Sequence, residues 1–126
     1  VGCSYTDPST SQKTFKQYWP TGTVASDAVG IVVDDPDVLF MAQADATVAQ
    51  TALGINCPLA AVQATGTGST TTGNSTSAVD ATVAVTTGIA FRIVDFVDST
   101  TSTVGDTYTD LVVKFNNHSY YNPVGI

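Results

Sequence analysis

The sequence of 126 residues lacks glutamate altogether and contains one histidine, two cysteines and four basic residues. Without glutamate and with a single histidine, the commonest general base, the chain has few groups besides aspartate for general acid–base catalysis. Charged residues make up 12% of the chain, and eleven aspartates give a net charge of −7, which disfavours binding to nucleic acid and to anionic membrane surfaces. No apolar run approaches the roughly 20 residues that a transmembrane helix requires.

Apolar, β-branched and small residues replace the missing charges. Hydrophobic residues make up 43% of the chain, and Val and Thr, which favour pleated sheet over helix, are abundant. A chain of this length fits one domain with its own core. We therefore expect a single all-β domain over residues 1–126, a compact antiparallel β-barrel or β-sandwich with at most one short helix. The chain begins Val1-Gly2-Cys3 without Met, which leaves room for an N-terminal portion ahead of it.

Apolar runs bounded by turn residues predict the strands. A short edge strand is expected at 14–18, and Pro8 and Pro20 make central strands improbable elsewhere in 3–27. Two runs on either side of the acidic turn at 34–37 predict a hairpin. The strong strands are expected at 28–33, 38–44, 79–85, 89–97 and 111–115.

Several local features refine this picture. Asp45 is expected to cap a short helix over 46–53 that ends at Gly54. The apolar parity of 89–97 changes around Asp95, which predicts a bulge. The Gly/Thr/Ser-rich stretch at 65–77 predicts a flexible, exposed loop. In 111–115 the residues Leu111, Val113 and Phe115 should face inward, and the whole core is expected to contain Ile31, Val33, Leu39, Val83, Phe91, Ile93, Val113 and Phe115.

The candidate chemical groups do not form a catalytic pattern. His118 stands beside a turn, and no Gly-x-Ser-x-Gly motif or cysteine nucleophile signature accompanies it. The aspartates at 34, 35 and 37 crowd one turn, which favours a solvated loop tip over a calcium site. Cys3 and Cys57 either form a disulfide or remain two unrelated thiols. We expect no enzyme activity, no cofactor and no metal site.

Aromatic residues beside turns are the strongest candidates for an interface. Rigid rings bury a large area at low entropy cost, so exposed rings make good anchors for a partner protein. The alternative is that these rings cover the open ends of the barrel. The candidate interface residues are Tyr18, Trp19, Pro20, Tyr120 and Tyr121.

Several segments resemble small virion proteins of tailed bacteriophages. These are Gly2-Cys3-Ser4-Tyr5-Thr6-Asp7-Pro8 running into Tyr18-Trp19-Pro20, Val32-Val33-Asp34-Asp35-Pro36, and Phe115-Asn116-Asn117-His118. The resemblance covers most of the chain, although the loop at 65–77 departs from the pattern. It implies a protein that decorates or cements the phage head, with further strands ahead of Gly2 and no catalytic residue.

The expected function is therefore a structural virion protein on the capsid surface. Its expected partners are the major capsid protein and copies of itself, for example in a trimer, with no nucleic acid and no membrane. The alternative is a secreted bacterial surface module, such as an adhesin, pilus or sheath subunit, located outside the cell or on its surface. Low charge and a high content of Ser, Thr and Gly suit both functions equally.

Overall fold

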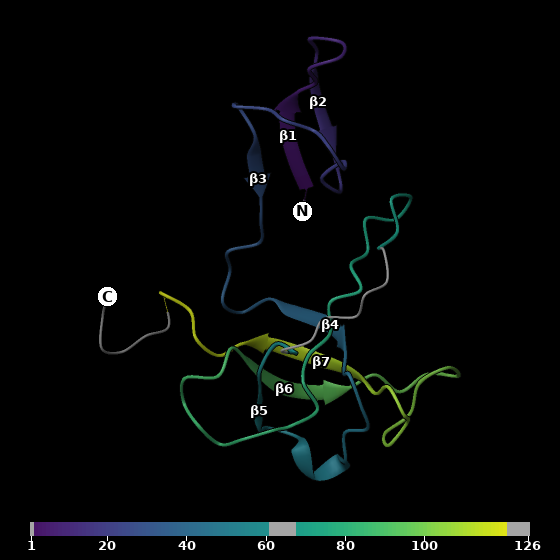
Figure 1. The fold of residues 1–126 in the computed structure, drawn as a ribbon. Helices are drawn as coiled ribbons and strands as arrows, with labels where there is room; N and C mark the ends of the chain where they lie inside the picture. The colour runs from purple at the N-terminus through teal and green to yellow at the C-terminus, as the bar shows by residue number, and fades with distance from the viewer. Residues whose placement is uncertain (1, 61–67, 121–126) are drawn as a thin grey trace. The chain divides into compact units, whose positions relative to one another are not determined.

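The computed structural model describes residues 2–60 and 68–120, and its chain forms two compact units. The N-terminal unit comprises Val1–Asp34 with Gly66–Ser75, and the C-terminal unit comprises Asp35–Thr65 with Thr76–Ile126. Each unit contains one antiparallel sheet, so the expected all-β class is confirmed (Figure 1). No closed barrel forms within the described residues. We expected one domain over 1–126, and the two units are described separately below.

The N-terminal sheet has three strands in the order β2-β1-β3. The strand β1 (Gly2–Thr6) pairs antiparallel with β2 (Lys13–Lys16) and with β3 (Val29–Ile31). The edge strand expected at 14–18 is thus confirmed as β2. A central strand within 3–27 was considered improbable, and that prediction is wrong, because β1 is the central strand of this sheet. It ends at Thr6, so neither Pro8 nor Pro20 occupies a position in the ladder.

The hairpin expected from 28–33 and 38–44 does not form. The strand β3 pairs with β1, whereas β4 (Leu39–Gln43) pairs with β7 (Asp110–Phe115). The turn between them is local, because Asp35 Oδ1 accepts a hydrogen bond of 2.9 Å from the Asp37 N–H. The predicted turn therefore exists, but the strands that it joins belong to different sheets.

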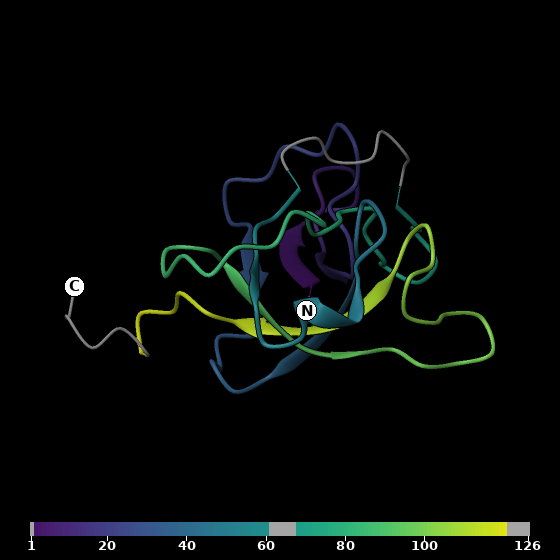
Figure 2. The ribbon, with the colours of Figure 1, turned by 90° about the horizontal axis from the view of Figure 1, so that it is seen from below.

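The C-terminal sheet has four strands in the order β4-β7-β6-β5, with β5 at Asn56–Cys57 and β6 at Phe91–Phe96. The yellow β7 runs beside the green β6 in both ribbon views (Figures 1 and 2). Their register shifts between Ile93 and Asp95, which confirms the predicted bulge. Leu111 and Val113 of β7 are buried, as the alternation predicted.

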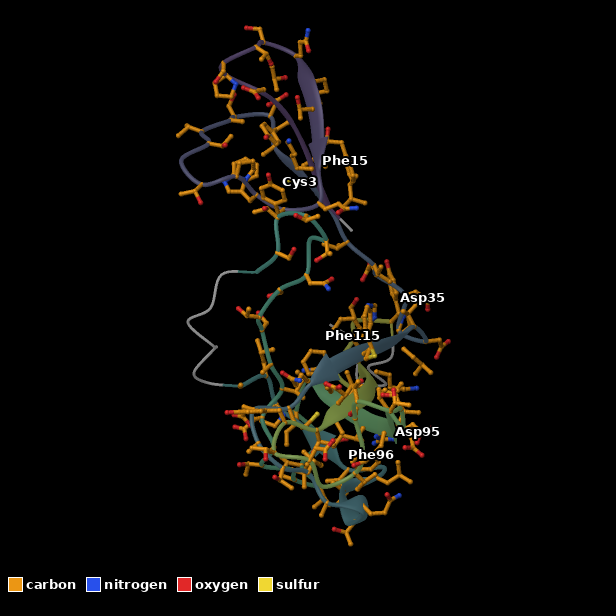
Figure 3. The ribbon with its side chains drawn as sticks, turned by 90° about the vertical axis from the view of Figure 1, so that its right-hand side faces the viewer. Cys3, Phe15, Asp35, Asp95, Phe96 and Phe115 are labelled. Atoms are coloured by element: carbon orange, nitrogen blue, oxygen red, sulfur yellow. The ribbon has the colours of Figure 1, made fainter. Side chains whose placement is uncertain are left out.

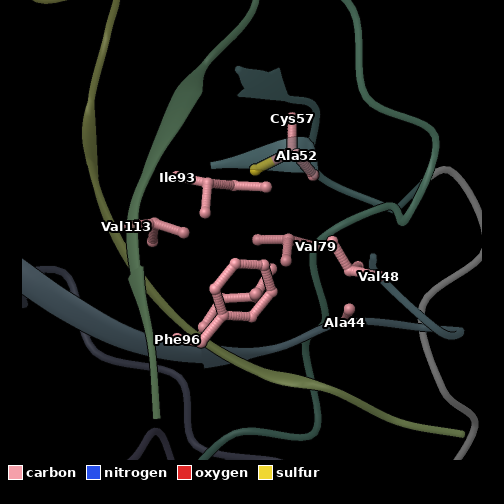
Figure 4. Packing of buried hydrophobic residues seen from close by; sticks show 9 residues of the cluster. Ala44, Val48, Ala52, Cys57, Val79, Ile93, Phe96 and Val113 are labelled. Carbon is pink, nitrogen blue, oxygen red and sulfur yellow. The ribbon is translucent and has the colours of Figure 1, made fainter. Parts of the chain in front are cut away.

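The core of the C-terminal unit is a cluster of small and branched apolar side chains around one phenylalanine. In Figure 4 the side chains of Ile93, Val79 and Phe96 point toward one another. Phe91 lies partly buried against this cluster, and its ring stacks on that of Phe115 at 5.6 Å. The buried members are Ala44, Val48, Ala52, Cys57, Val79, Ile93, Phe96, Leu111 and Val113.

Five of the eight expected core residues are buried or partly buried. The side chains of Ile93 and Val113 are almost fully buried, while Val83, Phe91 and Phe115 are partly buried. The two that are fully buried face each other across the longest strand pair, β6 and β7. The alternation of side chains along these strands was therefore a sound guide to the core.

The other three expected core residues are exposed, and these predictions are wrong. Ile31, Val33 and Leu39 are 46%, 38% and 53% exposed. The run in β4 is apolar at both parities, so alternation could not reveal that Phe40 and Ala42, rather than Leu39, pack against the core. Ile31 is exposed because it lies on β3, an edge strand of the N-terminal sheet, and Val33 lies two residues beyond the end of that strand.

Two weaker elements differ from the prediction. The helix expected over 46–53 is a single 3-10 turn at Gln50–Ala52, which Gly54 follows with a positive φ of 80°. Asp45 does not cap it, because Asp45 Oδ1 accepts a hydrogen bond of 2.8 Å from the Ala81 N–H. The strand expected at 79–85 is reduced to isolated bridges at Val79 and Ala84.

The loop expected at 65–77 is only partly described, since 65–67 lie outside the described residues. Its described part contains a closed turn in which the Ser69 N–H donates to Asn74 O at 2.9 Å. Gly73 has a φ of 74°, and a Cβ atom there would lie 2.8 Å from the Cβ atom of Gln17. This turn therefore packs closely against the N-terminal unit to which it belongs.

Truncating Ile93 to alanine should lower the free energy of unfolding by about 2–5 kcal/mol, because the side chain is buried in a packed core. Leu39→Ala, a matched truncation on the exposed face, should cost less than about 1 kcal/mol. Phe91→Ala should fall below the roughly 3–5 kcal/mol of a fully buried ring. Guanidinium denaturation followed by circular dichroism measures all three, and equal losses at Ile93 and Leu39 would contradict the inward faces assigned here.

Candidate functional site

Charge is divided unequally between the two units. The N-terminal unit carries two lysines against three aspartates, a formal charge of −1. The C-terminal unit carries one lysine and one arginine against eight aspartates, a formal charge of −6, and the two values add to the −7 of the chain. The share of charged residues is similar in the two units, but the lower net charge of the N-terminal unit repels a second acidic surface less. The N-terminal unit is therefore the better candidate for a docking surface.

One face of the N-terminal sheet is covered by the turn that contains Tyr18, Trp19 and Pro20. The ring of Trp19 packs on that of Tyr5 with centroids 5.2 Å apart, and Tyr5 is almost fully buried. The thiol of Cys3, which shares this face of β1 with Tyr5, donates to Tyr18 O at 3.3 Å. Trp19 remains 46% exposed, so its ring both covers Tyr5 and is available to a partner.

The same turn borders a pocket of about 350 Å³. Tyr18 and Pro20, two of the expected interface residues, line it together with Tyr5. Its remaining walls are mostly polar, with one lysine and one aspartate. The other lining residues are Asp7, Pro8, Ser9, Lys16, Thr21, Gly22 and Thr23.

The opposite face of the N-terminal sheet carries exposed apolar side chains. Phe15 of β2 and Val29 of β3 both stand opposite Ser4 of β1, so they share the face that Cys3 and Tyr5 do not occupy. Figure 3 labels Cys3 and Phe15, which lie on the neighbouring strands β1 and β2. Phe15, Val29 and Ile31 are 56%, 57% and 46% exposed. A Cβ atom on Gly2 would lie 2.6 Å from the Phe15 ring, so the ring lies over β1. We call Phe15, Val29 and Ile31 the apolar face.

Sequence reasoning missed this apolar face. Ile31 was assigned to the core, and Phe15 was placed on an edge strand and left out of the candidate interface residues. The available signal was the position of Phe15 between Lys13 and Lys16, since a ring flanked by solvated charges on a short edge strand is seldom buried. Contiguous exposed apolar side chains of this kind mark interaction sites.

A charged group fixes β3 to the rest of the sheet. Asp27, two residues ahead of β3, accepts hydrogen bonds from the Thr6 N–H at 3.0 Å and the Thr6 hydroxyl at 2.7 Å. Lys13 Nζ lies 2.8 Å from Asp27 Oδ2. Lys13 and the two Thr6 donors hold the pKa of the Asp27 carboxyl well below its usual range. This one carboxylate therefore joins all three strands at one end of the sheet.

The second expected interface group lies in the C-terminal unit. Tyr120 is 74% exposed, and its ring lies 5.2 Å from that of His118. The Tyr120 N–H donates to His118 Nδ1 at 3.2 Å, and the His118 ring in turn lies 6.0 Å from Phe115. Tyr121 lies outside the described residues. The two aromatic groups thus belong to separate units.

The groups considered for chemistry make local contacts within their own segments. His118 packs between Phe115 and Tyr120, and Asp35 holds its own turn. Within residues 2–60 and 68–120, no three His, Cys, Asp or Glu side chains are placed to hold a metal ion together. The same residues contain no helix long and apolar enough to cross a membrane.

Both cysteines are free thiols, so the disulfide considered between them does not form. Cys3 is partly buried in the N-terminal unit, and Cys57 is fully buried in the core of the C-terminal unit. Burial, with a smaller contribution from Asp80, raises the pKa of the Cys57 thiol to about 11.

The chain matches no protein-family model, no curated protein and no solved structure.

The two thiols should differ sharply in reactivity. At pH 8 iodoacetamide should modify Cys3 first and leave Cys57 intact, because a buried thiol with a raised pKa supplies almost no thiolate. Cys57 should react only after unfolding in guanidinium. Mass spectrometry of the alkylated protein measures both sites, and modification of the two thiols at equal rates in the folded protein would contradict the buried position of Cys57.

The link through Asp27 should make the N-terminal sheet sensitive to acid. Because the folded-state pKa of Asp27 is lowered, its stabilising contribution is present above about pH 4 and is lost as the pH falls toward the lowered value. Asp27→Asn should therefore destabilise the protein at pH 6, and the difference between wild type and variant should shrink as the pH falls below about 4. Amide hydrogen exchange of β1 and β3 across this range measures the effect, and a constant difference at every pH would exclude Asp27 as its source.

Proposed function

We propose that this chain is a structural virion protein that decorates or cements the capsid of a tailed bacteriophage through protein–protein contacts. The observation that carries the proposal is the N-terminal unit, which combines a charge of −1 with exposed Phe15, Trp19, Val29 and Ile31. Such a surface suits burial against another protein better than it suits solvent. The sequence segments that resemble phage virion proteins support the same function.

The docking element that we propose for the shell is the turn at Tyr18, Trp19 and Pro20. Trp19 is half-exposed and is supported from behind by Tyr5, so its ring is already held in place before a partner arrives. A ring that is fixed in advance loses little conformational entropy on binding. Tyr18 and Pro20 add the walls of the adjoining pocket, which could receive a side chain of the major capsid protein. Tyr120 and Tyr121 are the second proposed contact.

The acidic C-terminal unit fits a position on the outer surface of the shell. A formal charge of −6 opposes contact with packaged nucleic acid and keeps the unit soluble at high local density. No catalytic, cofactor or metal role is part of this proposal. The protein acts by binding the major capsid protein and copies of itself.

The proposal predicts that Trp19→Ala loses occupancy on purified phage heads. Loss of an interface anchor costs about 2 kcal/mol or more, which lowers the affinity roughly 30-fold. The free protein should stay folded with a lower melting temperature, because the substitution removes the Tyr5–Trp19 ring contact, worth about 0.5–1.5 kcal/mol, and also the area that the half-buried ring covers. Occupancy by quantitative gel analysis of washed heads and melting of the free protein are measured together.

Tyr108→Ala is the matched control. Tyr108 is an exposed aromatic residue of the C-terminal unit outside both proposed contacts, so its truncation should leave occupancy unchanged. Full occupancy of Trp19→Ala heads would exclude the aromatic turn as the docking element. If the wild-type protein never binds heads and is instead recovered from bacterial cell surfaces, the secreted surface module is correct.

A further inference from the structure

The two edges of the N-terminal sheet differ in chemistry. The edge strand β2 begins and ends with lysine, and charged residues on an edge discourage pairing with another chain. The other edge, β3, has no charge and continues as an apolar run from Val29 to Val33. All five residues of this run are exposed, and the space beside Gly30 is open. Only the β3 edge therefore lacks protection against strand addition.

The pairing within the sheet shows which backbone groups of β3 are available. The Thr6 N–H donates to Asp27, so alternate residues of β1, namely Gly2, Ser4 and Thr6, direct their backbone groups toward β3. Ile31 and Val29, which stand opposite Gly2 and Ser4, are thereby paired with β1. The backbone groups of Gly30 point away from β1, and the alternation extends this direction to Val32.

We propose that β3 pairs antiparallel with β3 of a second copy around a two-fold axis at Ile31, which joins two three-stranded sheets into one of six strands. In this register Gly30 of each copy exchanges backbone hydrogen bonds with Val32 of the other, and both present outward-facing groups. Val29 stands opposite Val33, and Ile31 stands opposite its own copy. Every cross-strand pair is apolar, or glycine with an apolar residue, and none is charged.

Charge identifies a second copy, rather than a cationic partner, as the occupant of this edge. A cationic partner attracted by the net charge of −7 would bind against acidic side chains, and the run 29–33 contains none. The same run is complementary to itself, as contact across a two-fold axis requires. Moving the axis to Gly30 would place Val33 opposite Asp27, whose carboxylate is already paired with Lys13. The axis at Ile31 confines the pairing to the uncharged run 29–33, and Asp27 stands opposite Asp35 of the other copy only beyond this run, where the turn at 34–37 begins.

This inference deepens the proposed function by naming the contact between copies, and its test uses the free protein without phage heads. Sedimentation equilibrium of the full chain should show the mass rising with concentration from 13.0 kDa toward twice that value. Ile31→Lys places like charges directly opposite each other and should weaken the dimer roughly tenfold or more. Val85→Lys adds the same charge at an exposed site of the C-terminal unit and should leave the dimer intact.

Disulfide trapping tests the register in a Cys3→Ser background, in which the other thiol, Cys57, is buried. Ile31→Cys should form a covalent dimer in oxidised glutathione, because residues directly opposite on paired strands lie within disulfide reach. Val29→Cys should not, since the register separates the two Val29 residues by four positions, about 13 Å. A chain that stays monomeric at every soluble concentration, or equal trapping of both variants, overturns the proposal. Loss of head occupancy by Ile31→Lys in a strictly monomeric protein would assign the edge to a shell strand instead.

Discussion

The packing of Trp19 on Tyr5 determines which face of the N-terminal sheet is covered, and the proposed contacts depend on it. A sheet of three short strands gains stability when one face is buried, and the turn after β2 supplies that cover through one large ring and the thiol hydrogen bond of Cys3. The described residues of this unit supply no second layer for the other face. Phe15, Val29 and Ile31 consequently remain exposed on this sheet.

The parts of the fold that could be predicted from the sequence are those that local patterns determine. Regular alternation in β7 identified Leu111 and Val113 as inward-facing, and the change of parity at Asp95 identified the bulge in β6. Strand pairing could not be predicted in this way, because an apolar run does not indicate its partner. For that reason 28–33 and 38–44 were joined into a hairpin, although β3 pairs with β1 and β4 with β7.

The candidate site shows the same division. An exposed turn at Tyr18, Trp19 and Pro20 could be predicted from the sequence, because aromatic residues beside proline and glycine favour such turns, and Trp19 is half-exposed. The packing of Trp19 on Tyr5 could not be predicted from the sequence, since only the folded sheet brings the two residues together. Ile31 and Val33 were assigned to the core because hydrophobicity reports only a tendency to leave water. It does not distinguish burial within one chain from burial between two.

The division of charge gives the two units different parts in association. Apolar burial acts only at contact, whereas the repulsion between acidic surfaces extends over a Debye length of about 8 Å at physiological salt. Because the C-terminal unit carries −6 of the total charge of −7, close contact through the N-terminal unit brings few like charges into the interface itself. The charge of the C-terminal units produces the remaining repulsion. It opposes disordered clustering of many copies, while a pairing confined to one uncharged strand edge of the N-terminal unit stays accessible.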